Sequence, residues 1–249
     1  MGFSTATGGI MRSILGIDTA SPRGSVALLV DGAPRGTAAL SRGEHSSGLA
    51  NAAARLMREA GLGVGLASLS GLAVSQGPGS FTGLRIGLAW AKGLAVGAGV
   101  PLALVSAHEA AAHAAASAGP TDGELLVTVT PGERKELEFA LWEPPAAARS
   151  RPRLLLAPES VPEDELTDRL IAMSSGGGAW AGRSLRAIPA NDAIAALLDE
   201  DEIARAPVLA LAESVAVVGD LLIEEGRAAD VVLAAPAYGR APNARKPSA

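Results

Sequence analysis

Short apolar runs separated by turn residues mark the strands in the first half of the chain. An uninterrupted apolar run such as residues 14–17 is typical of a strand that is buried on both faces. The dipeptide Asp31-Gly32 predicts a hairpin turn, because both residue types tolerate positive φ. The pattern predicts five strands in this half, over residues 14–17, 25–30, 33–40, 72–74 and 101–105.

Apolar residues at helical spacing mark the helices between these strands. Over residues 45–60, Leu49, Ala53, Leu56 and Ala60 recur every three or four positions and predict one apolar face. Two further helices are predicted over residues 81–98 and 106–118. Three strands followed by alternating helices and strands indicate a lobe of the α/β or α+β class.

The second half of the chain has a less regular pattern. Strands are predicted over residues 125–129, 137–142 and 154–157, and helices over residues 162–173 and 207–225. Residues 144–152 are rich in Pro, Ala and Arg, which predicts a mobile loop. The predicted units are an extension of residues 1–10, a first lobe of residues 11–118, a smaller second lobe of residues 119–241 and a tail of residues 242–249. Both ends of the chain are expected to be disordered.

A glycine-rich stretch after residues 72–74 has two interpretations. Glycines flanking Pro78 predict a tight turn, and Ser80 or Thr82 can cap the helix that follows. The turn could serve packing alone, or its free N–H groups could contact an anion or nucleotide. Arg85 in the first turns of the helix favours a nearby anion or carboxylate. The candidate residues are Gly77, Pro78, Gly79, Ser80, Thr82 and Arg85.

The helix over residues 81–98 contains more glycine than an isolated helix tolerates. Gly83 and Gly87 are four residues apart, and Gly93 and Gly97 repeat this spacing. Each interior glycine costs about 0.8–1 kcal/mol relative to alanine. Close approach of another helix or strand can offset this cost, so we expect a packed surface along these glycines.

Composition narrows the class of protein. Hydrophobic residues make up 48% of the 249 residues and aromatic residues only 3%, so the core must consist mainly of Ala, Leu, Val and Ile. The formal net charge of −5 does not attract a phosphate backbone. Absence of cysteine excludes disulfides, thiolate metal sites and a cysteine nucleophile. Arg85, Lys92 and Pro101 interrupt the longest apolar run, so we expect no membrane span and a cytoplasmic protein.

The histidines do not form a recognisable metal or catalytic motif. His108 and His113 are five residues apart, which places them roughly 140° apart around a helix and prevents them from sharing one ion. His45 precedes a predicted helix and favours a capping or interface role. The sequence also contains no Gly-x-Ser-x-Gly motif that could supply a hydrolase nucleophile. We therefore expect no metal site and no protease site.

Two motifs carry a resemblance to a known family. Residues 14–20 read Ile-Leu-Gly-Ile-Asp-Thr-Ala, and residues 77–87 read Gly-Pro-Gly-Ser-Phe-Thr-Gly-Leu-Arg-Ile-Gly. Together they resemble the bacterial TsaB family, also called YeaZ. The resemblance implies a two-lobed actin-like ATPase (ribonuclease H-like) superfold of the α/β class, with mixed sheets flanked by helices. It also implies a non-catalytic scaffold in the machinery that makes N6-threonylcarbamoyladenosine at position 37 of tRNA.

The same resemblance implies the partners of the chain. It would pair with and activate the catalytic subunit TsaD together with the ATPase TsaE, and it would meet tRNA only through the complex. The helices over residues 45–60 and 81–98 would form a helical bundle with the partner. The interface candidates are His45, Leu49, Leu56, Gly83, Leu84, Gly87, Leu88 and Ala91. A homodimer of the isolated chain and an ATP or ADP at the partner interface both stay open, and no other cofactor is expected.

The first motif departs from that of active ATPases in this superfold. There, an aspartate at the end of the first strand belongs to an Asp-x-Gly-x-Thr hairpin that handles phosphate and metal. Asp18 and Thr19 are present here, but Ala20 occupies the glycine position, so the hairpin is degraded. Asp18 can equally satisfy the N–H groups of its own turn. We therefore expect no enzyme activity from the chain alone, and the alternative is an actin-like ATPase or small-molecule kinase.

Overall fold

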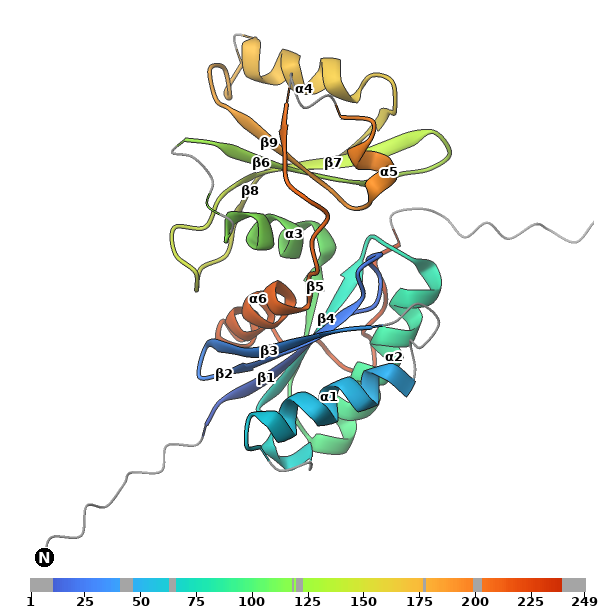
Figure 1. The fold of residues 1–249 in the computed structure, drawn as a ribbon, viewed down its shortest axis with the longest axis vertical. Helices are drawn as coiled ribbons and strands as arrows, with labels where there is room; N and C mark the ends of the chain where they lie inside the picture. Colours follow the sequence, from blue (N-terminus) through green and yellow to red (C-terminus); the bar gives the residue numbers. More distant parts are fainter. Residues whose placement is uncertain are drawn as a thin grey trace, which may run out of the picture.

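A computed structural model of the chain describes residues 11–40, 47–62, 66–117, 119, 123–176, 178–198 and 203–238. These residues form two lobes, each built on a five-stranded sheet, stacked along the long axis of the molecule (Figure 1). His45 lies outside the described residues, so its predicted interface role has no structural counterpart here.

The first sheet confirms the predicted strands of the first half. Its strands are β1 (Ser13–Asp18), β2 (Ser25–Val30), β3 (Ala33–Ala39), β4 (Gly71–Gly77) and β5 (Leu102–Ser106), in the order β3-β2-β1-β4-β5. Strand β2 runs antiparallel to its neighbours, whereas β1, β4 and β5 are parallel. Asp31 and Gly32 form the β2–β3 turn with φ of 50° and 75°, as the Asp-Gly pattern predicts.

The second sheet repeats the topology of the first. Its strands are β6 (Leu125–Pro131), β7 (Glu136–Glu143), β8 (Arg153–Pro162), β9 (Leu185–Pro189) and β10 (Ala204–Arg205). Read from β8, the order is β8-β7-β6-β9-β10, with the first two pairings antiparallel and the last two parallel. Two mixed sheets of the same order confirm the two-lobed actin-like class. The sequence analysis missed β9, although it is as long as the predicted β5, and it missed β10, which has only two residues.

Helices cover both sheets (Figure 1). They are α1 (Ser47–Glu59), α2 (Phe81–Ala98), α3 (Ala107–Ala116), α4 (Leu166–Ser175), α5 (Asp192–Ala195) and α6 (Ala212–Glu224), with a short 3-10 turn at Leu66–Ser68. Helices α1 and α2 pack on one face of the first sheet and α6 on the other. Helix α3 lies between the lobes and contacts both α6 and β6. No helix among the described residues is long and apolar enough to span a membrane.

The C-terminal part of the chain packs against the first lobe, whereas the sequence analysis placed it in the second. Helix α6 packs against β1, β2, β4 and β5. Beyond it, Ala229 bridges to Leu102, and the N–H of Ala237 donates to the carbonyl oxygen of Gln76 at 2.7 Å. The predicted second lobe of residues 119–241 therefore includes a C-terminal part that belongs to the first lobe. A helix on the open face of the first sheet completes its core.

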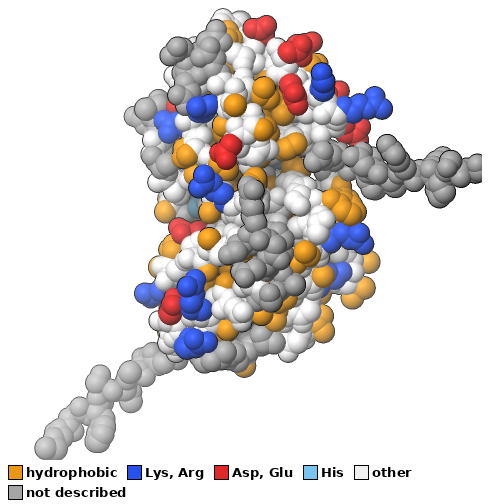
Figure 2. Space-filling model, turned by 45° about the vertical axis from the view of Figure 1, so that its right-hand side comes forward, with side chains coloured by type: hydrophobic (Ala, Val, Ile, Leu, Met, Phe, Trp, Pro, Cys, Tyr) orange, Lys and Arg blue, Asp and Glu red, His pale blue; other side chains and the backbone are white. Residues whose placement is uncertain are grey.

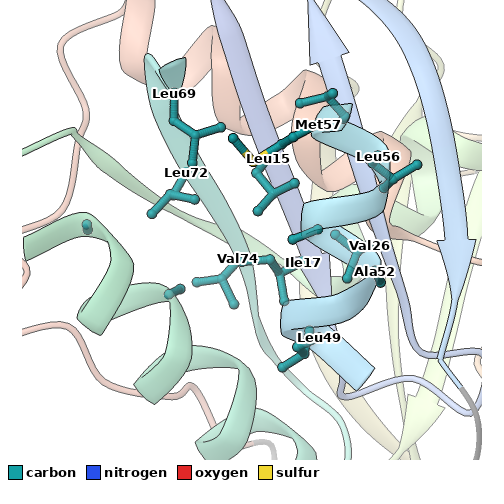
Figure 3. Close-up of a cluster of buried hydrophobic side chains, with 14 of the residues drawn as sticks. Leu15, Ile17, Val26, Leu49, Ala52, Leu56, Met57, Leu69, Leu72 and Val74 are labelled. Carbon is teal, nitrogen blue, oxygen red and sulfur yellow. The ribbon is translucent and has the colours of Figure 1, made fainter. Parts of the chain in front are cut away.

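The largest hydrophobic cluster lies between the first sheet and α1 and α2. Leu15 and Leu72 from the sheet meet Leu49 and Leu56 from α1, and all four are at most 4% exposed (Figure 3). Aliphatic side chains dominate this cluster, in keeping with the low aromatic content. This packing holds the ends of β1 and β4 in place beside the lobe junction.

Candidate functional site: the crevice between the lobes

A cavity of about 380 Å³ opens between the two lobes. It lies at the ends of β1 and β4 in the first lobe, beside α3, and at the ends of β6 and β9 in the second. The lining residues are Asp18, Thr19, Ala20, Ser21, Pro22, Pro78, Gly79, Ser80, Ala107, Ala111, Thr128, Val129, Thr130, Pro131, Ile188, Pro189, Ala190, Asn191, Leu209 and Leu211. Concave sites of this size at a lobe junction are the usual place for a small ligand.

Asp18 is bound by the turn that follows it. One carboxylate oxygen accepts hydrogen bonds from the N–H groups of Ala20 at 3.0 Å and Ser21 at 3.3 Å, and the other accepts from the Ser21 hydroxyl. The side chain is fully buried, and this desolvation raises the pKa of Asp18 although the hydrogen bonds lower it. This geometry matches an aspartate that satisfies its own turn.

The glycine-rich loop is fastened to the same turn. The N–H of Ser80 donates to the carbonyl oxygen of Ala20 at 2.9 Å, and the Ser80 hydroxyl accepts from the N–H of Gly83 at 3.2 Å. Ser80 is therefore the N-cap of α2. The sequence analysis had predicted either Ser80 or Thr82 for this role. Thr82 lies in the first turn of the helix and is exposed.

The predicted anion-contacting residues do not converge on one place. Pro78, Gly79 and Ser80 line the cavity, whereas Thr82 and Arg85 do not. The guanidinium carbon of Arg85 lies 5.1 Å from the ring centre of Phe81, which stacks on Tyr238 at 4.9 Å. Arg85 thus covers an aromatic ring on the outer surface. It does not face the crevice.

The walls of the cavity are poorly matched to a polyanion. Asp18 is the one charged residue among those that line it, and no lysine or arginine does. Phosphate groups are bound in proteins chiefly by guanidinium, ammonium or metal cations and by free N–H groups. Among the described residues there is also no group of three or more His, Cys, Asp or Glu side chains that could hold a metal ion. Phosphate binding at this lining would therefore depend on backbone N–H groups, such as those at the start of α2 beside Gly79 and Ser80.

His108 belongs to a polar network on the inner face of the second sheet. Its Nδ1 lies 2.8 Å from the hydroxyl of Thr128, which accepts from the indole N–H of Trp142 at 3.0 Å. Its Nε2 lies 3.1 Å from Oε1 of Glu138. Since a carboxylate only accepts, Nε2 carries a proton and donates to Glu138. Thr128 and Thr130 line the cavity, so this network forms part of its wall.

His113 belongs to a separate network on another side of α3. Its Nε2 donates to the carbonyl oxygen of Ala148 at 3.1 Å, and its Nδ1 lies 3.0 Å from the hydroxyl of Ser214. Burial lowers the pKa of His113, because the charged ring loses its hydration. The two histidines therefore serve different packing contacts, which agrees with the angular separation expected from their spacing.

The predicted partner-interface side chains lie inside the first lobe. Leu49, Leu56, Leu84, Leu88 and Ala91 are all at most 4% exposed and belong to its core. Fully covered side chains cannot form an outer surface, so this part of the predicted interface is wrong. The apolar stripes of α1 and α2 face their own sheet because burial there removes the most apolar surface from water.

Gly83 and Gly87 allow close packing as expected, but the neighbour is the turn after β1 of the same chain and not a partner. A Cβ at Gly83 would overlap the carbonyl oxygen of Thr19, and a Cβ at Gly87 would overlap the Thr19 hydroxyl. That hydroxyl donates to the carbonyl oxygen of Gly83 at 2.7 Å. The glycines therefore let α2 pack against the turn after β1, which corrects their assignment to a partner interface.

The outward face of α2 carries a second set of small residues. Ala89, Gly93 and Gly97 are exposed along one side, and Val96 is 73% exposed. A Cβ at Gly93 would meet no atom within 4 Å. Figure 2 shows hydrophobic side chains gathered on the surface of this lobe. The sequence analysis expected packing along all four glycines. The structure shows it at Gly83 and Gly87 but not at Gly93 and Gly97, because the repeat alone does not show which stripe is buried.

Comparisons with known proteins agree with the fold. Residues 39–139, less than half of the chain, match a family model described as TsaD: tRNA N6-adenosine threonylcarbamoyltransferase. The structure of YeaZ from Pseudomonas aeruginosa is similar with a TM-score of 0.73 and 21% identity, covering 92% of this chain and 100% of that one. An uncharacterized protein with similarity to peptidase YEAZ from Pseudomonas aeruginosa gives a TM-score of 0.72 with the same identity and coverage.

The sequence motifs and the fold both indicate similarity to the YeaZ structures. No curated protein matches the sequence at a significant level. The likeness to the YeaZ structures extends over both lobes, and the family-model match includes the glycine-rich loop. These findings show that the chain has the fold of the YeaZ structures and that residues 39–139 are similar to the TsaD family model.

Proposed function

We infer that this chain is a TsaB-type subunit and propose that it acts as a non-catalytic scaffold in tRNA N6-threonylcarbamoyladenosine formation. It pairs with the catalytic subunit TsaD and activates it together with the ATPase TsaE, in the cytoplasm. Contact with tRNA runs through the complex, because the chain itself has a net charge of −5. The observation that carries the proposal is the YeaZ-like fold over 92% of the chain, together with the two motifs.

The crevice supports a non-catalytic role. The position at which active members of the superfold handle phosphate and metal holds Asp18, and three hydrogen bonds from its own turn occupy this carboxylate. The cavity beside it presents no cation to a phosphate group. Among the described residues that line the cavity, none carries a positively charged side chain that would stabilise the charge of phosphoryl transfer.

The outward face of α2 is the surface we propose for partner binding. Ala89, Gly93 and Gly97 leave the helix backbone accessible, so a partner helix can approach closely. Val96 adds exposed apolar area at the same end of the helix. The same surface would serve a homodimer of the isolated chain, in competition with TsaD.

A bulky residue on this face tests the proposal. Gly93→Leu has open space around its Cβ, so the fold should tolerate it, whereas a closely packed partner helix should not. Gly178→Leu is a matched control, because a Cβ at Gly178 in the second lobe also meets nothing within 4 Å. We expect Gly93→Leu to lose co-elution with TsaD while neither variant has a lower melting temperature than the parent. Co-elution of Gly93→Leu at the parent level would refute this interface.

An actin-like ATPase or small-molecule kinase is the second candidate. The cavity of about 380 Å³ at the lobe junction favours it, because ligands of such enzymes bind between lobes. The purified chain alone should show no ATP turnover above background if the scaffold proposal is correct. Turnover that Asp18→Ala abolishes would establish the alternative.

A further inference from the structure

A loop of the second lobe is fastened to the first lobe by ion pairs. We call residues 144–152, between β7 and β8, the latch. Arg149 contacts α6 twice: its Nη1 lies 3.0 Å from Oδ2 of Asp220, and its Nη2 lies 3.0 Å from Oε1 of Glu224. The structure thus corrects the expectation of a mobile loop, which rested on composition alone.

Arg151, the next arginine of the latch, also pairs with two carboxylates of the neighbouring helices. Arg151 Nε lies 2.7 Å from Oε1 of Glu109 on α3, and its Nη1 lies 2.8 Å from Oε2 of Glu225. Between the two arginines, the latch is further held by the ring of His113, which donates to the carbonyl oxygen of Ala148 at 3.1 Å. Five polar contacts therefore join this one loop to α3 and to the end of α6.

The carboxylate of Asp220 makes the latch stronger than an ordinary surface contact. Its side chain is fully buried and lies between Arg149 and Arg12, whose Nε is 2.7 Å from Oδ1. Removing one partner from a buried ion pair is costly, because the remaining charge is left without compensation in a medium of low polarity. Exposed ion pairs lack this penalty.

The latch and the crevice lie on opposite sides of α3. Ala107 and Ala111 line the cavity, whereas Glu109 and His113, each two residues further on, contact the latch. Two residues turn an α-helix by about 200°. Figure 1 shows the loop descending to α6 on one side of α3, while α5 and the start of α2 lie on the other.

We propose that the latch sets the angle between the two lobes and holds the crevice open. Narrowing the crevice requires the second lobe to rock about α3 toward the start of α2. The same movement lifts the opposite side and separates Arg149 from Asp220 and Arg151 from Glu109. Closure of the crevice therefore requires the ion pairs of the latch to break. While these ion pairs are intact, the lobes keep one relative orientation.

Distance measurements across the mouth of the crevice test this coupling. The chain contains no cysteine, so Arg23→Cys and Ala193→Cys give one spin label on each lobe. Both positions are exposed. Arg23 follows the lining residue Pro22, and Ala193 lies two residues after the lining residue Asn191. Electron–electron double resonance on the labelled full-length chain then reports the distribution of interlobe distances.

The variants are Arg149→Gln, Arg151→Gln and their combination. Arg153→Gln is the matched control, because Arg153 pairs with Glu143 within the second lobe at 2.6 Å. Arg151→Gln leaves the buried Asp220 pairs intact, so it remains informative if Arg149→Gln unfolds. We expect the latch variants to shift the distribution to shorter distances and to broaden it, most in the double variant, whereas Arg153→Gln matches the parent.

Two outcomes would overturn the proposal. One is a distance distribution of the folded Arg151→Gln and double variants that coincides with that of the parent. The other is an equal shift in Arg153→Gln, which would show that loss of any arginine in this region changes the distance. Circular dichroism of each labelled variant establishes that the two lobes are still folded.

Discussion

Two glycines of α2 should respond in opposite ways to the same substitution. Gly83 faces the turn after β1, where a Cβ would overlap the carbonyl oxygen of Thr19, whereas Gly93 faces open space. Replacing each by alanine adds one methyl group and removes one glycine from the same helix. The pair therefore separates helix propensity from packing.

The magnitudes follow from this geometry. Gly93→Ala should gain about 0.8–1 kcal/mol of helix propensity and raise Tm by about 2–4 °C. Gly83→Ala has the same gain, but overpacking costs about 1–3 kcal/mol and loss of the buried Thr19 hydrogen bond about 0.5–1.5 kcal/mol. The net loss is about 2 kcal/mol, which corresponds to a fall in Tm of roughly 4–8 °C.

Thermal unfolding of the two variants and the parent, followed by circular dichroism, is sufficient to compare them. A second measurement, urea unfolding at 25 °C, checks that the change in Tm reflects a change in free energy. If Gly83→Ala is as stable as the parent, the glycine does not serve close packing within the chain. The assignment of that face of α2 to the core would then be wrong.

Three further predictions concern charge. Burial raises the pKa of Asp18, so the ionised carboxylate destabilises the fold at neutral pH. Asp18→Asn should therefore raise Tm at pH 7, and the increase should shrink as the pH falls. A lower Tm of this variant at pH 7 would contradict the prediction. Burial lowers the pKa of His113, so on acidification this ring takes up a proton in the unfolded chain before it does in the folded one. At pH values below about 6.5 the free energy of unfolding should therefore decrease as the pH falls, and it should decrease less steeply in His113→Gln. Equal slopes in the two proteins would exclude a role of this ring. The isolated chain should bind tRNA only weakly at physiological salt because of its net charge of −5, and a sub-micromolar Kd in a filter-binding assay would be incompatible with this.

Local sequence patterns were sufficient for most elements of the first lobe. The strand at 14–17 and the strand at 72–74 are short apolar runs, and β1 and β4 occupy these places. Asp31 and Gly32 form the predicted turn because their φ preference acts locally. Ser80 caps α2 for the same reason: the hydrogen bond spans three residues and needs no distant contact.

The candidate site was only partly accessible from the sequence. The motif residues Asp18, Pro78 and Gly79 do meet at the crevice, because they follow two parallel strands that end at the same edge of the sheet. Thr130 and Asn191 line the same cavity from the second lobe, and no local pattern connects them to the first-lobe motifs. Their position depends on how the two sheets are stacked.

The sequence by itself determined the period of each element, the glycine turn, the composition of the core and the family resemblance. Tertiary structure decided which stripe of α2 is buried, that α6 returns to the first sheet, and that the latch is held by Arg149 and Arg151. The physical reason is the range of the forces involved. Turn geometry, capping and hydrophobic period act within a few residues, whereas burial and ion pairing join residues as distant in sequence as Arg12 and Asp220.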